Sequence, residues 1–85
     1  MIYATVGSVT TAVRLAKRLS ARGDMRSSVV HTPAEINNGG CSYSVRTSLR
    51  DTAAIRQIAA EYGIQIRGFY REDIFNGRKF YHVIS

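Results

Sequence analysis

The chain has 85 residues, of which 45% are hydrophobic and 21% are charged. A chain of this length makes one domain that buries roughly 60–65% of its unfolded surface, which argues against a deep cavity for a large substrate. No apolar run approaches the roughly 18 residues of a membrane span, and the N-terminal residues lack the basic and apolar regions of a signal peptide. We therefore expect a cytoplasmic protein that does not use a membrane.

The basic residues outnumber the acidic ones, twelve to six, which gives a formal charge of +6. A solvated surface explains this excess, because several of the charges fall on positions that an amphipathic helix exposes. An acidic partner such as nucleic acid is the less favoured explanation. The single cysteine excludes an internal disulfide, and with only two histidines we expect no metal site.

The N-terminal part of the chain predicts a strand and a helix. Residues 2–6 alternate as in a short strand that stops at Gly7, and Ser8 is typical of a helix N-cap. The helix covers residues 9–22 and ends at Gly23. Its expected buried stripe consists of Val9, Ala12, Val13, Ala16 and Leu19. Its expected solvent face carries Arg14, Arg18 and Arg22.

The middle of the chain predicts two further strands and a second helix. Residues 25–32 have a β-branched centre, and Pro33 ends that strand. The turn-rich residues 34–40 lead into a strand at about residues 41–49, in which Tyr43 and Val45 share a face. A helix capped by Asp51 and ended by Gly63 follows, with an expected buried stripe of Ile55, Ile58, Ala59 and Tyr62.

The C-terminal part predicts a β-hairpin. A fourth strand is expected to start at Ile64, and Asn76-Gly77 is a strong signal for a two-residue turn. The expected opposite pairs are Phe75 with Arg78, Glu72 with Tyr81, and Tyr70 with Val83. The last residues therefore predict a fifth strand on the outer edge of the fourth.

The order of these elements predicts the fold class. A β-α-β-β-α-β order with short connections indicates an α+β protein, in which two helices cover one face of an antiparallel sheet. Right-handed crossovers favour a ferredoxin-like two-layer sandwich, and the hairpin extends the strand order to 5-4-1-3-2. Residues 1–85 are expected to form this single domain.

Cys41 is the residue that we expect to carry chemistry. In the predicted topology it lies beside Gly7, Ser8 and Val9, where the start of the first helix would favour a thiolate. The preceding Gly39 and Gly40 would give partner proteins access to the sulfur. The alternative is that Cys41 is an inert, buried, small side chain.

Three segments carry a resemblance to a known family. They are IYATVGSVTTA at the start, the pair Thr32-Pro33, and NNGGCSYSVR around Cys41. With them the chain resembles the selenium/sulfur carrier-like family of small proteins, long classed as a domain of unknown function. The resemblance implies that Cys41 holds sulfur or selenium as a persulfide-type adduct. The cargo would come from a donor such as a cysteine desulfurase and pass to an acceptor enzyme. The chain departs from the family pattern at Ser42, where glycine is usual, and at Ala34, where arginine is frequent.

Taken together, these observations predict a carrier without turnover of its own and without a cofactor beyond the carried atom. The expected binding residues are Gly7, Ser8, Val9, His31, Gly39, Gly40 and Ser42. His31 would lie at the same end of the sheet as Cys41 and act as a base or cationic partner. A surface histidine without a role is the more common case.

A helix-free aromatic sheet face is the basis of two other hypotheses. The expected alternation places Tyr3, Phe69, Phe75, Phe80 and Ile84 on that face. Such a patch would support a homodimer, or the stacking of single-stranded RNA. The chain lacks the common RNA-binding signature in its third strand. An RNA-binding module, or a dimeric interaction domain whose cysteine is incidental, therefore remains the alternative to a carrier.

Overall fold

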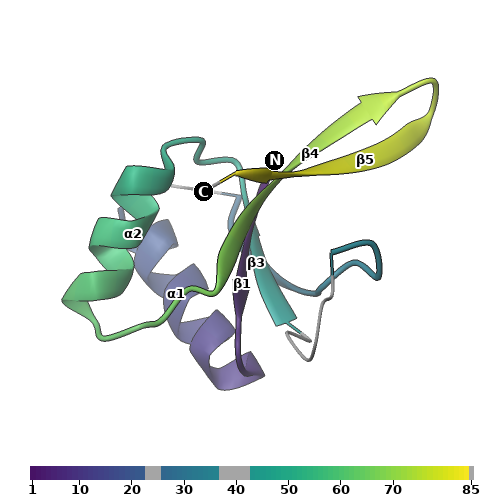
Figure 1. The fold of residues 1–85 in the computed structure, drawn as a ribbon. Helices are drawn as coiled ribbons and strands as arrows, with labels where there is room; N and C mark the ends of the chain where they lie inside the picture. Colours follow the sequence, from purple (N-terminus) through teal and green to yellow (C-terminus); the bar gives the residue numbers. More distant parts are fainter. Residues whose placement is uncertain (23–25, 37–42, 85) are drawn as a thin grey trace.

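The computed structural model describes residues 1–22, 26–36 and 43–84, and they form an α+β fold (Figure 1). Its elements are β1 (Ile2–Val6), α1 (Val9–Ala21), β2 (Ser28–His31), β3 (Tyr43–Thr47), α2 (Thr52–Glu61), β4 (Gly68–Phe75) and β5 (Arg78–Ile84). Neither helix is long and apolar enough to cross a membrane within the described residues.

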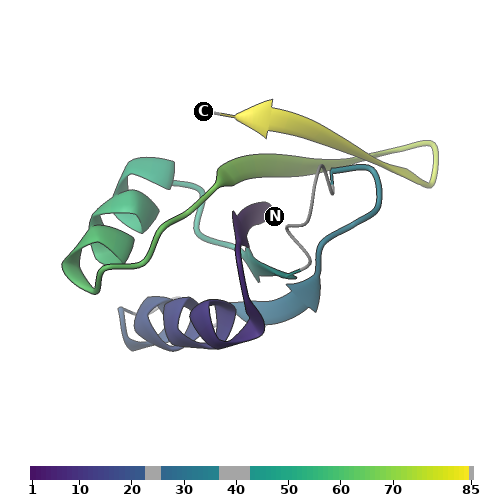
Figure 2. The same ribbon diagram turned by 60° about the horizontal axis from the view of Figure 1, so that its bottom comes forward.

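The five strands form one antiparallel sheet in the order β2-β3-β1-β4-β5. Counted from the β5 edge, the neighbours are those of the expected order 5-4-1-3-2. Both helices lie on the same side of this sheet (Figure 1). The tip of the β4–β5 hairpin extends away from the helices, as the second view also shows (Figure 2).

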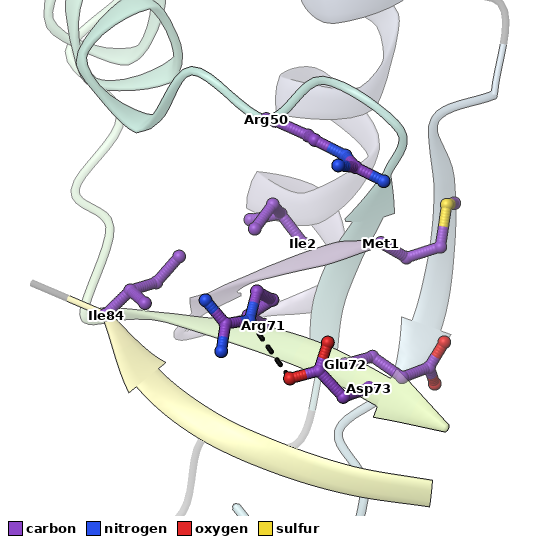
Figure 3. Close-up of a pocket in the computed structure, with 7 residues that line it drawn as sticks. All are labelled: Met1, Ile2, Arg50, Arg71, Glu72, Asp73 and Ile84. Carbon is purple, nitrogen blue, oxygen red and sulfur yellow. Dashed lines mark hydrogen bonds and ion pairs between the residues drawn. The ribbon is translucent and has the colours of Figure 1, made fainter. Parts of the chain in front are cut away.

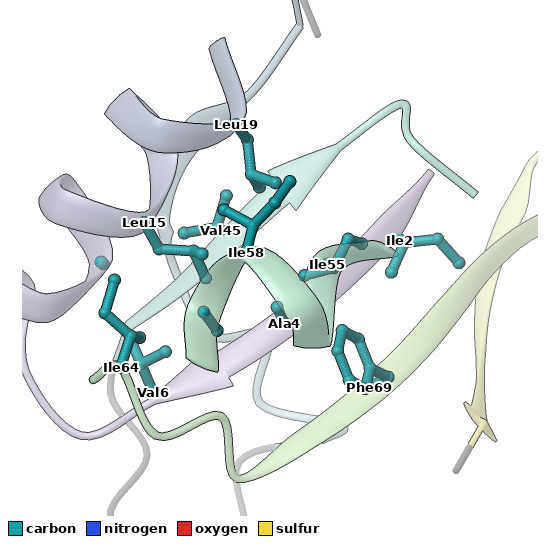
Figure 4. Close-up of a cluster of buried hydrophobic side chains, with 12 residues drawn as sticks. Ile2, Ala4, Val6, Leu15, Leu19, Val45, Ile55, Ile58, Ile64 and Phe69 are labelled. Carbon is teal, nitrogen blue, oxygen red and sulfur yellow. The ribbon is translucent and has the colours of Figure 1, made fainter. Parts of the chain in front are cut away.

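The hydrophobic core lies between the helices and the sheet (Figure 4). Alternate residues of β1 and Val45 of β3 point toward the helices, because successive strand side chains point to opposite faces. Val45 was expected there, and Tyr43 packs against the same cluster. The central members, all fully buried, are Ala4, Val6, Ala12, Leu15, Leu19, Val45, Ile55 and Phe69.

The β4–β5 hairpin confirms the prediction from Asn76-Gly77. Both residues have positive φ angles, 51° and 74°, as a type I′ turn requires. The register pairs Phe75 with Arg78, Glu72 with Tyr81 and Tyr70 with Val83. The position of the two-residue turn was therefore enough to predict the register of the whole hairpin.

The exposed and buried faces of α1 differ from the prediction. Val9 and Val13 are 45% and 38% exposed, whereas Leu15, which the predicted stripe left out, is fully buried. The three arginines expected on the solvent face are exposed. Arg14, Arg18 and Arg22 contact the C-terminal end of α2. Helical periodicity predicted that α1 has a buried and an exposed face, but tertiary packing decided which residues lie on each face.

The predicted aromatic patch on the helix-free face is wrong. β4 starts at Gly68, four residues later than expected, and its register sets Phe69 opposite Ala4 on the helix side. Phe69 is fully buried there, and Ile84, its partner on β5, packs against the same cluster. Tyr3 does lie on the helix-free face, but it is only 4% exposed. Phe75 and Phe80 are 67% and 44% exposed on the hairpin, so the five residues do not form one helix-free patch. The dimer and RNA-binding hypotheses stay predictions.

The second and third strands are shorter than expected. β2 begins at Ser28, after the non-strand residues 26 and 27, and β3 ends at Thr47 instead of residue 49. The predicted β3 start at Cys41 lies outside the described residues.

Candidate functional site

Four chain segments meet at one end of the sheet. They are the end of β1, the start of α1, the end of β2 and the start of β3. Val6, the last residue of β1, pairs with Tyr43, and Tyr43 also pairs with His31 of β2. Gly7 then leads into Ser8, whose Oγ accepts a hydrogen bond from the Thr11 amide at 3.2 Å. This confirms Ser8 as the N-cap of α1.

Four of the expected site residues fall within the described part of the chain. Gly7, Ser8, Val9 and His31 all lie at this end of the sheet. Cys41, Gly39, Gly40 and Ser42 lie outside the described residues. Along the chain, Cys41 precedes Tyr43 by two residues.

His31 contacts an aromatic ring at this end of the sheet. Its ring centroid is 5.0 Å from that of Tyr43, with an angle of 32° between the planes. The side chain is exposed, and the two residues are opposite partners in the β2–β3 ladder. Stacking on Tyr43 restrains the orientation of the imidazole.

A pocket of about 230 Å³ lies at the start of α1. Two separate segments line it: Gly7, Ser8, Thr11 and Arg14 at the start of α1, and Gly63, Ile64, Gln65 and Arg67 between α2 and β4. The amide of Arg67 donates to the Thr5 carbonyl at 2.8 Å, which ties the second segment to β1. A Cβ added at Gly7 would lie 3.1 Å from Nη2 of Arg67, so the guanidinium would have to shift by a few tenths of an ångström.

The groups around this pocket suit an anion. Ser8 and Thr11 provide hydroxyls, Gln65 an amide, and Arg14 and Arg67 two guanidinium groups. None of the described residues that line the pocket carries a carboxylate. Arg14 Nη2 donates to the Tyr62 carbonyl at 2.9 Å, which holds its guanidinium at the pocket edge. The sequence analysis did not identify Arg14, Gln65 or Arg67 as site residues. No local signal reveals them, because only tertiary packing brings the 63–67 segment to α1.

A second polar cluster is buried on the helix-free face of the sheet. Glu72 Oε2 accepts from the Tyr3 hydroxyl at 2.9 Å, and Glu72 Oε1 accepts from Arg46 Nη2 at 3.1 Å. The Tyr81 hydroxyl is a third, longer donor at 3.5 Å, and its ring meets that of Tyr3 edge-on. The Glu72 side chain is only 3% exposed. Side chains from β1, β3, β4 and β5 therefore meet at one buried carboxylate.

The cluster shifts the titration of its members. Burial alone would raise the pKa of Glu72, but the hydrogen bonds from Tyr3 and Arg46 and the nearby positive charges outweigh it and lower that pKa. Burial, together with the hydrogen bond to Glu72, raises the pKa of Tyr3. Burial and the negative charges of Glu72 and Glu35 also raise the pKa of Tyr81. All of these groups keep their ordinary neutral-pH charges, so we assign the cluster a structural role.

Metal-binding groups are not gathered in the part of the chain that the structure describes. Within residues 1–22, 26–36 and 43–84, no three His, Cys, Asp or Glu side chains are placed to hold an ion. The second histidine, His82, contacts Asp73 at 3.3 Å on the exposed hairpin.

A family of known proteins matches the chain. No curated protein and no solved structure matches the chain significantly. The model of the family described as "Putative Se/S carrier protein-like" matches residues 1–71. This range covers most of the chain and includes Cys41 and every residue of the pocket at the start of α1. The chain therefore belongs to the Se/S carrier-like family.

Proposed function

We propose that this protein carries sulfur or selenium on Cys41 as a persulfide-type adduct and delivers it to an acceptor enzyme. The family match over residues 1–71 is the observation on which this proposal rests. The single cysteine provides one carrying atom, and its thiol form suits the reducing cytoplasm in which we place the protein. The protein would hold and transfer the atom without catalysing turnover of its own.

The proposed transfer step needs no outside oxidant. The Cys41 thiolate attacks the outer sulfur of a persulfide on the donor, such as a cysteine desulfurase. A new S–S bond forms on Cys41 while the S–S bond of the donor breaks, and the donor cysteine leaves as a thiolate. Delivery repeats the exchange: a nucleophile of the acceptor attacks the outer sulfur, and the Cys41 thiolate leaves. Selenium in the outer position follows the same steps.

The pocket at the start of α1 supports an anionic cargo. Cys41 is two residues from Tyr43, whose partner Val6 directly precedes Gly7 and Ser8 of the pocket. A persulfide is ionised near neutral pH and would be stabilised by hydroxyl donors and by guanidinium groups. We assign this stabilising role to Ser8, Thr11, Arg14 and Arg67.

Loading of the purified protein tests this proposal. After incubation with a cysteine desulfurase and cysteine, the intact mass should rise by about 32 Da for sulfur, and by about 79 Da when the donor carries selenium. The gain should disappear on treatment with a thiol reductant and be absent in Cys41→Ser. A protein that gains no mass, or a Cys41→Ser variant that gains the same mass, contradicts the proposal.

We also infer that the domain is a ferredoxin-like sandwich extended by one hairpin strand. The β-α-β-β-α-β order, the central position of β1 between β3 and β4, and two helices on one side support this inference. An experimentally determined structure of the full chain tests it.

A further inference from the structure

A second pocket, of about 310 Å³, lies at the opposite end of β1 from the pocket that contains Gly7 (Figure 3). The first two residues of the chain, Arg50 before α2, the middle of β4 and the end of β5 line it. This volume is near the lower end of the range of roughly 300–1,000 Å³ typical of small-molecule sites. The pocket is separate from the residues to which we assign the cargo.

Some of the charged side chains of this pocket have an ionic partner, and one has none among the described residues. Arg71 Nε is 3.1 Å from Asp73 Oδ2, and His82 Nε2 is 3.3 Å from the same oxygen. Arg71 and Asp73 therefore neutralise each other. Arg50 makes no hydrogen bond or ion pair with any residue in the described ranges 1–22, 26–36 and 43–84. Its guanidinium extends from the β3–α2 connection toward Met1 (Figure 3).

Met1, Ile2 and Ile84 form the apolar part of the wall. Ile2 is 3% exposed, and Ile84 is half-buried against the core cluster. Glu72 contributes to the lining, but its carboxylate points away from Arg50 and is bound by Tyr3 and Arg46 on the other face of the sheet (Figure 3). The pocket thus combines one unneutralised guanidinium with an aliphatic surface.

We propose that this pocket binds a small organic monocarboxylate with a short aliphatic body. The planar guanidinium of Arg50 presents two parallel N–H donors that match the two oxygens of a carboxylate. Ile2 and Ile84 then contact the aliphatic body and remove it from water. The aliphatic part of the wall favours an anion with an apolar body over a phosphate, which has no apolar part.

Titration of the ¹⁵N-labelled full chain with hexanoate tests the proposal. The amide signals of Ile2, Arg50 and Ile84 should shift in a saturable way. Hexylamine has the same aliphatic chain with the opposite charge and should not saturate these shifts, and inorganic phosphate should bind at least about tenfold more weakly than hexanoate. Arg50→Gln should weaken hexanoate binding about tenfold or more, because it removes a charge-assisted pair. Arg78 is an exposed arginine at the hairpin tip. The Arg78→Gln variant should bind hexanoate as tightly as the unchanged protein does.

Three results would overturn the proposal. They are shifts that do not saturate, hexylamine or phosphate binding as tightly as hexanoate, and Arg50→Gln binding hexanoate normally. Because Arg50 is exposed and makes no hydrogen bond or ion pair within the described ranges, its replacement should leave the signals of residues outside the pocket unchanged. The test uses no sulfur donor, so it is independent of the carrier proposal.

Discussion

The guanidinium carbon of Arg18 lies 4.1 Å from the centroid of the Tyr62 ring and joins α1 to the end of α2. The neighbouring arginines, one helical turn away on either side, act on the same part of α2. Arg14 donates to the Tyr62 carbonyl at 2.9 Å, and Arg22 forms an ion pair with Glu61 at 2.6 Å. A stripe of one residue type at a spacing of four thus forms the polar contact between the helices.

Replacing Tyr62 by alanine should destabilise the protein by about 2 kcal/mol, because it removes both the contact with Arg18 and the packing of the ring against the core. Urea unfolding near neutral pH measures this change. Lys17 is exposed on α1 next to Arg18, so Lys17→Ala is the control and should change stability by less than about 0.5 kcal/mol. Equal effects of the two substitutions would contradict the role of Tyr62.

The lowered pKa of Glu72 predicts a loss of stability in acid. A carboxyl whose pKa is lower in the folded state stabilises the protein above its unfolded pKa, about 4.5, and this contribution is lost as the pH falls through the folded value. Glu72→Gln should cost about 1–3 kcal/mol near neutral pH and flatten the decline below about pH 4.5. Denaturant unfolding across this range measures both effects. Glu61→Gln, an exposed carboxylate on α2, should flatten the decline less; an equal or larger flattening would argue against Glu72.

The raised pKa of Tyr3 predicts the opposite dependence in alkali. A phenol whose pKa is higher in the folded state stabilises the protein below its unfolded pKa, about 10, and this contribution is lost as the pH rises above that value. Tyr3→Phe should cost about 1 kcal/mol near neutral pH and reduce the alkaline loss. Unfolding measured on both sides of about pH 10 checks this. Tyr81→Phe, which removes only the 3.5 Å bond, should have the smaller effect.

The turn at Gly77 tests a backbone effect without a packing effect. Its φ of +74° is unfavourable for other residues, and a Cβ there would meet nothing within 4 Å. Gly77→Ala should therefore destabilise the protein by about 1–2 kcal/mol through the backbone alone. Thermal unfolding measures the change, and Arg78→Ala at the next position is the control. A neutral effect of Gly77→Ala would contradict the turn geometry.

Gly7→Ala tests the pocket at the start of α1. The new Cβ would lie 3.1 Å from the flexible end of Arg67, so the side chain should move and the stability should change by less than about 0.5 kcal/mol. If Arg67 stabilises the carried anion, the rate of sulfur loading on Cys41 should fall. Gly77→Ala is the converse control, since it should lower stability and leave loading unchanged. Normal loading in Gly7→Ala would remove Arg67 from the proposed site.

Local chemistry in the sequence determined the positions of several elements. Asn76-Gly77 set the register of the hairpin, because few residues tolerate positive φ at both positions of a two-residue turn. Ser8 and Asp51 marked the starts of the two helices, because their side chains accept hydrogen bonds from amides of the first turn that would otherwise be unpaired. The family was also evident from segments of the sequence, and the match over residues 1–71 shows it.

Only the tertiary structure decided which face of each element is covered. Alternation in β4 defined two sets of side chains, but the pairing of Ala4 with Phe69, 65 residues apart in sequence, placed Phe69 in the core. The same kind of distant contact turned Arg18 onto Tyr62 and brought Arg67 over Gly7. Periodicity is a property of neighbours along the chain, whereas coverage depends on which distant segment packs against them. The pockets, which need two or more such segments, were therefore decided by the fold.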